Sequence, residues 1–309
     1  MPARPRLFAR PDRVVYRSPD VRVGTFHCPT EHPEFRTAGP IEGYTVVFPR
    51  SAVWIRHAGR APFVADPSVA VIYNQGQAYV RHPLAPDGDR ADWFSLSRAL
   101  AAEIMRDIDA GAATDGERPF PVAFGPANAA LYYRQRLLFS RLVQGGLHPL
   151  EVEQEVLMIV GLALERAVGR SSDARRCEGR EVVQRARAEL ARNPAERPTI
   201  RQLAGRLDVS PFHLCRVFRR TTGLTLHHYL LELRTRVALE RFEEGAGSLS
   251  RLALELGFSS HSHFTAEFRR RLGVAPSRVR RVLQSQGRPA GETGPPGVAA
   301  GLRARAGRR

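Results

Sequence analysis

The chain has 309 residues, of which 43% are hydrophobic and 25% charged, with a formal net charge of +16. This is the composition of a globular protein long enough for two domains, and no apolar run approaches the roughly 20 residues that a membrane helix needs. Three widely spaced cysteines exclude a disulfide framework, and the N-terminus lacks an apolar signal-peptide core, so we expect a cytoplasmic protein.

Residues 14–94 are predicted to form β-strands. The segments YTVVFPRSAVWIRH (44–57) and SVAVIYNQGQAYVRH (68–82) are rich in Val, Ile and Tyr and alternate in part between apolar and polar positions. Turn signals containing Pro, Asn, Asp and Gly separate these segments. Short strands at this spacing favour a small sandwich or barrel within residues 1–95.

Residues 96–168 are predicted to be mainly helical. A helix at 95–109 precedes a Gly/Pro-rich loop that ends at residue 126, and two further helices follow in 127–143 and 149–168. The last helix carries a broad apolar stripe that includes Val156, Ile159 and Leu164. That stripe packs either on the chain's own barrel or on a second copy, and we favour a homodimer.

A polar stretch at residues 169–180 lacks periodicity and predicts a linker. Helices are then predicted at 181–192, 200–207, 211–221, 225–244, 249–256 and 260–271, and the Gly, Pro and Arg content of residues 285–309 predicts a disordered basic tail. Residues 178–284 carry 20 arginines against 11 acidic residues, whereas residues 1–177 have a net charge of only +3. The concentration of positive charge in the C-terminal third predicts a polyanionic partner for that part alone.

The basic segment contains an internal repeat. TIRQLAGRLDVSPFHLCRVFRRTTG (199–223) matches SLSRLALELGFSSHSHFTAEFRRRLG (248–273), and each copy has a capped short helix, a turn, and a second helix that ends at Gly. Each copy is a helix-turn-helix, with the units at about 199–221 and 248–271. We expect the core of the two units to be formed by Leu203, Ala204, Leu214, Phe218, Leu252, Ala253, Gly257, Phe264 and Phe268.

The two faces of the last helix have different chemistry. Phe264 and Phe268 lie on one face, whereas His261, Ser262 and Thr265 lie on another. In a helix-turn-helix the second helix enters the major groove of DNA. The helix of about 20 residues between the two units spans about 30 Å, which is close to the ~34 Å between successive major-groove openings on one side of the duplex. One chain can therefore place two recognition helices in adjacent grooves.

Residues 181–284 resemble the DNA-binding domain of AraC/XylS-type transcription regulators, most specifically in GFSSHSHF and GVAPSRVR. The resemblance implies binding to double-stranded DNA in two adjacent major grooves and contact with RNA polymerase. It further implies that bases are contacted by Phe212, Cys215, Arg216, His261, Ser262 and Thr265. Phosphate contacts are implied for Arg219, Arg220, Arg269 and Arg270.

The N-terminal half is similar to the cupin-like sensor domain and helical dimerisation region of the same family, in its strand rhythm and in NQGQAYVRHPL and GDRADWF. Tyr79 stands where relatives often carry His, so the ligand is not carried over. The pocket for a small-molecule effector would be lined by Trp54, Tyr73, Tyr79 and Arg81. Aromatic residues in a small barrel, however, commonly form the core of the barrel.

We therefore expect an α+β chain: a cupin-like sensor domain (1–95), a helical dimerisation region (96–168), a linker (169–180) and an all-α DNA-binding domain (181–284). No catalytic residue, metal site or cofactor is predicted, because the histidines of the N-terminal half lack metal-binding spacing. The alternatives are a regulator without a ligand, a cupin-type metal enzyme fused to the DNA-binding part, and a DNA-coating protein. The last of these leaves the neutral N-terminal half unexplained.

Overall fold

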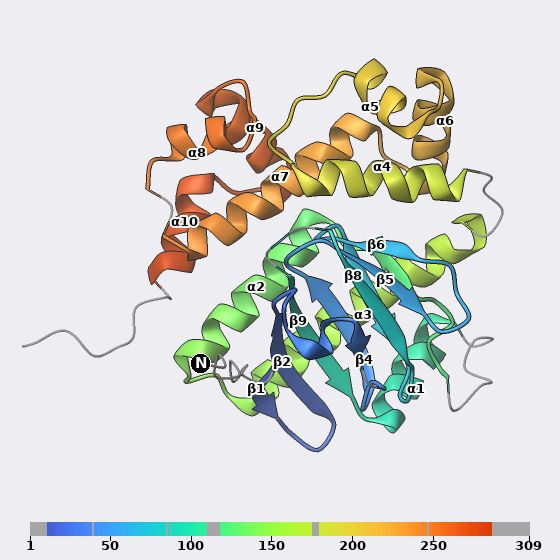
Figure 1. Cartoon of the computed structure of the whole chain (residues 1–309). Helices are drawn as coiled ribbons and strands as arrows, with labels where there is room; N and C mark the ends of the chain where they lie inside the picture. The colour runs from blue at the N-terminus through green and yellow to red at the C-terminus, as the bar shows by residue number, and fades with distance from the viewer. Residues whose placement is uncertain are drawn as a thin grey trace, which may run out of the picture.

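The structure, a computed structural model, describes residues 11–38, 40–84, 86, 88–109, 118–174, 179–245 and 247–285. A β-rich N-terminal domain with its own helices is followed by a C-terminal domain built of helices (Figure 1). The α+β organisation predicted from the sequence is confirmed at this level. The predicted basic tail, except its first residue, lies outside the described residues.

The N-terminal domain contains two antiparallel sheets. The larger has the order β1-β2-β9-β4-β7-β10, with β1 (Asp12–Arg17), β2 (Val21–Cys28), β4 (Tyr44–Pro49), β7 (Val69–Tyr73), β9 (Asp89–Leu96) and β10 (Phe124–Pro126). The smaller has the order β3-β8-β5-β6, with β3 (Thr37–Ala38), β5 (Val53–His57), β6 (Phe63–Ala65) and β8 (Tyr79–Pro83); a 3-10 turn, η1 (Pro33–Phe35), precedes β3. Strand β10 lies in the segment that the sequence predicted to be a loop.

Strand β7 shows how the layers are stacked, because all five of its residues are buried. Successive side chains of a strand point to opposite faces of its sheet. Val69, Val71 and Tyr73 join the core between the two sheets, whereas Ala70 and Ile72 join the core beneath the helices. The domain therefore has three layers, with the larger sheet in the middle.

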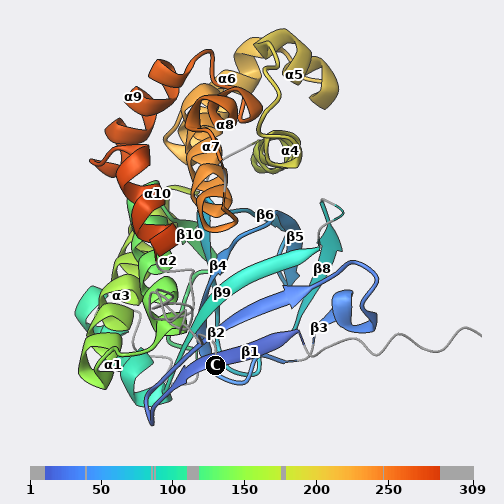
Figure 2. The ribbon, with the colours of Figure 1, turned by 90° about the vertical axis from the view of Figure 1, so that its left-hand side faces the viewer.

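Helices α1 (Arg98–Ile108), α2 (Ala129–Gln144) and α3 (Pro149–Ala174) form the third layer, and Figure 2 shows them on one side of the strands. The side chains of Ser97 and Asn128 cap α1 and α2 by accepting hydrogen bonds from backbone N–H groups three residues later, at 3.3 and 3.0 Å. These caps fix where each helix begins.

The apolar stripe of α3 is covered by the chain's own domain. Val156, Ile159 and Leu164 are fully buried and pack with the larger sheet and the other helices. The stripe therefore gives no support to a homodimer, which stays a prediction. Helix α3 also continues through Ala174, so the linker predicted from residue 169 was wrong at its beginning. The apolar stripe ends at residue 168, but the helix does not need apolar residues to add another turn.

The C-terminal domain contains α4 (Arg180–Arg192), α5 (Ile200–Leu207), α6 (Pro211–Thr222), α7 (Leu226–Glu243), α8 (Leu249–Glu255), α9 (His261–Leu272) and α10 (Pro276–Ser285). One core joins α4, α5 and α6 to the first half of α7, and another joins α8, α9 and α10 to its second half. Units α5–α6 and α8–α9 thus lie at opposite ends of α7 (Figure 1). Within the described residues, no helix combines the length and apolar composition needed to cross a membrane.

Candidate nucleic-acid interface

The two repeats of the sequence fold as two helix-turn-helix units with matching caps. Thr199 and Gln202 form a capping box at α5, in which each side chain accepts a hydrogen bond from the other residue's backbone N–H, at 3.2 and 2.8 Å. Ser248 caps α8 by accepting from the backbone N–H of Arg251 at 3.4 Å. Serines at positions 210 and 260 cap the second helices in the same way.

The turn of each unit requires left-handed backbone. Gly257 has φ +79°, and a Cβ atom at this position would lie 2.3 Å from the carbonyl oxygen of Ala195. Asp208, in the corresponding turn, has φ +56° and is the only non-glycine residue with positive φ in the described part of the chain. The glycine predicted for the second turn is therefore required by both conformation and space.

All eight predicted side chains of the helix-turn-helix core are buried, with at most 2% of each exposed to solvent. In the first unit these are Leu203, Ala204, Leu214 and Phe218, and in the second Leu252, Ala253, Phe264 and Phe268. The rings of Phe264 and Phe268 meet edge to face at 5.5 Å. This packing fixes which face of α6 and α9 points outward.

The outward face of α6 carries the residues predicted to contact DNA. Phe212 is 76% exposed, although large aromatic side chains are usually buried in proteins, and Cys215 and Arg216 are also exposed. The guanidinium carbon of Arg216 lies 6.0 Å from the centre of the Phe212 ring. Arg219 and Arg220 continue this exposed surface toward the C-terminal end of the helix.

The outward face of α9 carries His261 and Ser262, which are exposed, and Thr265, which is half-buried. Arg269 is exposed and has no ion-pair partner among the described residues. Arg270 instead pairs with Glu267 at 2.6 Å. A phosphate contact by Arg270 therefore has to compete with this intrahelical carboxylate, whereas Arg269 is available.

A buried arginine in the middle of α7 ties the two units together. The guanidinium of Arg234 donates to the carbonyl oxygens of Pro194 (2.7 Å), Glu196 (2.8 Å) and Gly257 (2.8 Å). Burial, and next the nearby charge of Arg197, lower the pKa of Arg234 to about 10. Because these carbonyls belong to the segment before α5 and to the turn before α9, one side chain fixes both units against α7. This contact could not be predicted from the sequence, because its partners are backbone carbonyls distant along the chain.

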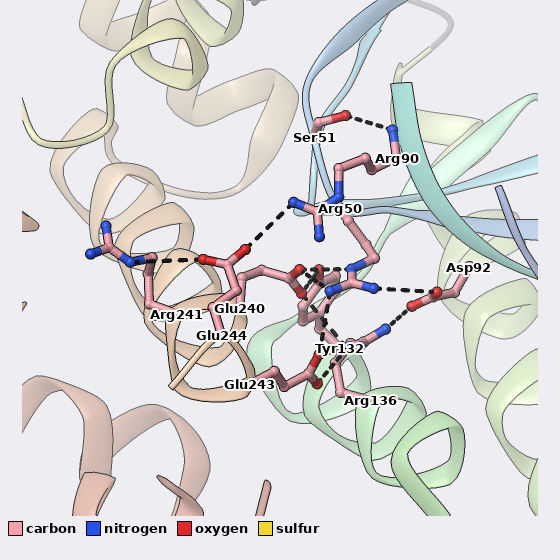
Figure 3. A network of polar contacts seen from close by, with 10 residues as sticks. All are labelled: Arg50, Ser51, Arg90, Asp92, Tyr132, Arg136, Glu240, Arg241, Glu243 and Glu244. Carbon is pink, nitrogen blue, oxygen red and sulfur yellow. Dashed lines mark hydrogen bonds and ion pairs between the residues drawn. The ribbon is translucent and has the colours of Figure 1, made fainter. Parts of the chain in front are cut away.

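The C-terminal domain is joined to the N-terminal domain by a network of ion pairs (Figure 3). Arg50, directly after β4, and Arg136, on α2, face Glu240 and Glu243 on α7. Arg50 Nε donates to Glu240 Oε2 at 2.6 Å, and Arg136 Nε donates to Glu243 Oε1 at 2.9 Å. Charge-assisted hydrogen bonds of this kind are stronger than neutral ones.

Asp92 and Tyr132 also belong to this network (Figure 3). Asp92, on β9, is fully buried and pairs with Arg136, and the hydroxyl of Tyr132 donates to Glu240 Oε1 at 2.9 Å. Burial opposes the ionisation of Glu240, but Arg50 and Arg136 outweigh it and hold the pKa of this carboxyl below its ordinary value. The network therefore holds the second half of α7 on the N-terminal domain.

A second junction holds the first half of α7 and helix α4. Arg187, on α4, donates to Asp66 Oδ2 at 2.9 Å and to the hydroxyl of Tyr229 at 3.0 Å, and that hydroxyl also donates to Asp66. Gln184 accepts a hydrogen bond from the backbone N–H of Val64 at 2.8 Å. The helix-turn-helix domain is thus fixed to the N-terminal domain at two separate points along α7.

Of the four residues predicted to line an effector pocket, three lie together and the fourth, Trp54, lies elsewhere. Tyr73 and Tyr79 pack between the sheets with ring centres 4.9 Å apart, and Arg81 is buried beside them, where Nη1 pairs with Asp89 Oδ2 at 3.0 Å. Trp54 lies on the opposite face of β5 and packs near α4. None of the four lines the cavity of about 680 Å³ between the two domains or the shallow hollow beside Phe212.

A buried histidine lies next to these tyrosines. His57 is fully buried, with its ring centre 4.6 Å from that of Tyr73 and 5.4 Å from that of Phe63. Burial, and next the charge of Arg60, lower the pKa of His57 to about 4. Across the residues that the structure describes, no three His, Cys, Asp or Glu side chains are grouped so as to hold a metal ion.

Comparison with known proteins finds a family that matches most of the helical domain. The family described as "Helix-turn-helix domain" matches residues 203–282. An uncharacterized HTH-type transcriptional regulator of Mycobacterium tuberculosis is 28% identical over 199 residues, which cover 60% of this chain and 53% of that protein. A putative AraC-like transcription regulator of Streptomyces antibioticus is 30% identical over 126 residues, which cover 41% and 42%. The chain spans about half the length, or less, of the curated relatives it matches.

Among solved structures, ToxT from Vibrio cholerae aligns with 85% of this chain and 99% of its own, with 11% sequence identity and a TM-score of 0.35.

Proposed function

We propose that this chain is a sequence-specific DNA-binding transcription regulator of the AraC type, because residues 203–282 match a helix-turn-helix family and a putative AraC-like transcription regulator is 30% identical over 126 residues. Helices α6 and α9 enter two adjacent major grooves. Arg216 on α6 and His261, Ser262 and Thr265 on α9 contact base edges there, and Arg219 and Arg269 contact phosphates. Phe212 and Cys215 offer apolar contact to base edges.

The observation that carries this proposal is that the outward faces of α6 and α9 are held rigidly at a fixed distance from each other. Helix α7 has 18 residues and therefore a length of ~27 Å. Arg234 ties both units to this helix through backbone carbonyls, so the distance between α6 and α9 is set by structure and not by a linker. Such spacing suits one side of a duplex, on which the major groove recurs about every 34 Å.

The N-terminal domain is proposed to regulate DNA binding. Its two antiparallel sheets fit a cupin-like sensor, and its two junctions with α4 and α7 give it direct contact with the DNA-binding part. A small-molecule effector and RNA polymerase are the partners that we infer for the whole protein. A binding role without catalysis agrees with the two relatives described above, both of which are transcription regulators by name.

Selection of random duplexes by the purified full chain tests this proposal. We expect the enriched duplexes to share two short motifs whose centres are about 10 base pairs apart. The variant Arg216→Ala should change the consensus at a guanine in one motif and leave the other motif unchanged, because Arg pairs with guanine O6 and N7. Enrichment without a common sequence would contradict sequence-specific recognition.

A further inference from the structure

A cavity of about 680 Å³ lies at the junction of the two domains. Strand β10 and helix α3 form its wall on one side, and α4 with the segment from α6 to α7 forms the other. Specific small-molecule sites commonly have volumes of roughly 300–1,000 Å³ and lie between domains. The cavity is therefore large enough for a small organic molecule, and such a molecule would touch both domains.

One part of the cavity wall is apolar. The rings of Phe63 and Phe124 are stacked, with centres 4.3 Å apart, and both line the cavity together with Val69, Pro121 and Val122. Apolar and aromatic walls of this kind favour a ligand with a hydrocarbon or aromatic body.

The charged part of the wall is strongly biased toward arginine. Glu232 is the one acidic residue among the lining residues that the structure describes, against five arginines at positions 60, 166, 180, 187 and 236. Asp66 neutralises Arg187, and Glu232 neutralises Arg236 through Nη2 at 2.9 Å. Arg166 and Arg180 therefore have no other carboxylate among the described residues of the wall to pair with.

Two of these arginines interact only with neutral groups among the described residues. Arg166, on α3, donates from Nη1 to Asn128 Oδ1 at 3.0 Å, and Arg180, at the beginning of α4, lies 6.0 Å from the centre of the Phe124 ring. Arg236 is 1% exposed, and its Nε and Nη1 atoms have no hydrogen-bond partner within the described part of the chain. The cavity thus combines an aromatic surface with uncompensated positive charge.

We propose that this cavity binds an amphipathic organic anion, in which a carboxylate, sulfonate or phosphate group is attached to an apolar body. The acidic group pairs with Arg166 and Arg180, and the body lies on Phe63 and Phe124. Arg166 comes from the N-terminal domain and Arg180 from the DNA-binding domain, so the bound anion links the two. This site differs from the barrel residues that the sequence suggested for an effector.

Binding is expected to favour the docked arrangement of the domains. Arg187 and Tyr229 line the cavity and also form the second junction, where they bind Asp66. A ligand that contacts both walls binds only when they face each other, and it therefore stabilises that arrangement by its differential affinity. This consequence rests on the proposed function, whereas the binding site itself does not.

A pair of dyes that differ by one charged group tests the site on the full chain. 1-Anilinonaphthalene-8-sulfonate carries a sulfonate, and N-phenyl-1-naphthylamine is the same ring system without it. Fluorescence titration should show that the sulfonate dye binds more tightly to the unmodified protein. The double variant Arg166→Gln with Arg180→Gln should weaken the binding of the sulfonate dye by on the order of tenfold. It should weaken the binding of the neutral dye by less than about twofold.

Two further variants control this experiment. Arg56→Gln removes an exposed charge of the same domain outside the cavity and should leave both affinities unchanged. Leu224 lines the cavity and is 37% exposed. The variant Leu224→Trp adds bulk there and should weaken the binding of both dyes. Equal binding of the two dyes, or an unchanged sulfonate-dye affinity in the double variant, would overturn the proposal. The titration contains no DNA, so its failure leaves DNA recognition standing, and the reverse also holds.

Discussion

Replacing Arg136 by leucine is expected to destabilise the chain by ~3–5 kcal/mol, because it leaves a buried carboxylate without its cation. The Arg136 side chain is 6% exposed and pairs with Asp92, which is 0% exposed, and with Glu243. The next cation, Arg50 Nη1, lies 4.0 Å from the nearest oxygen of Asp92, which is at the limit of an ion pair. In the variant, the free-energy cost of keeping the Asp92 carboxylate away from water would be only weakly offset by Arg50.

A matched control is available on the same helix. Arg141 pairs with Glu151, and both side chains are nearly half exposed, at 44% and 45%. The change Arg141→Leu should therefore cost only ~0–1 kcal/mol. Urea unfolding of the full chain, followed by circular dichroism and tryptophan fluorescence, measures both variants.

The expected pattern has a second part. Adding Asp92→Asn to Arg136→Leu should restore some of the lost stability, because the unpaired charge is removed. If Arg136→Leu costs no more than Arg141→Leu, the junction does not contribute as described, and the two domains are held together by other contacts.

Three more outcomes are expected. Arg216→Ala should weaken binding to a selected duplex by ~1–3 kcal/mol and spare a random duplex, measured by fluorescence anisotropy; an equal loss on both would make Arg216 a phosphate contact. Replacing His261 and Thr265 together by alanine should erase base preference in one motif alone when selection is repeated, and a change in both motifs would refute the assignment of α9 to one groove. The pKa of His57 is lowered from 6.5 to about 4, so the unfolded chain takes up the proton first and stability is lost as pH falls. The unfolding free energy should therefore drop by about 2 kcal/mol between pH 7.5 and 5, and His57→Gln should remove most of this dependence on pH. An unchanged pH dependence in the variant would contradict the role assigned to His57.

The helix-turn-helix units could be predicted because the signals that form them are local. Thr199, Ser210, Ser248 and Ser260 cap the helices at the predicted positions, and the apolar residues recur at helical spacing. Gly257 was expected in the turn and has the left-handed backbone that the turn needs. Helix α10 was not predicted, because this helix has only 10 residues and its apolar stripe is short.

The junction and the cavity could not be predicted, because the residues that form them are distant in the sequence. Arg50 and Glu240 are 190 positions apart, and each alone resembles an ordinary surface charge. The separation of Trp54 from the other three proposed effector residues could not be predicted for a related reason. Strand alternation tells which residues share a face, but only the packing of layers tells that Trp54 lies against α4 while Tyr73 lies between the sheets.

The spacing of α6 and α9 is tested most directly by inserting base pairs between the two motifs of a selected duplex. Five added base pairs turn one motif to the opposite side of the DNA, and Arg234 prevents the two units from separating to follow it. Affinity should fall steeply with five base pairs and recover only in part with ten, because the chain cannot stretch by a further turn. Equal affinity for the original and the five-base-pair duplex would show that only one of the two helices contacts DNA.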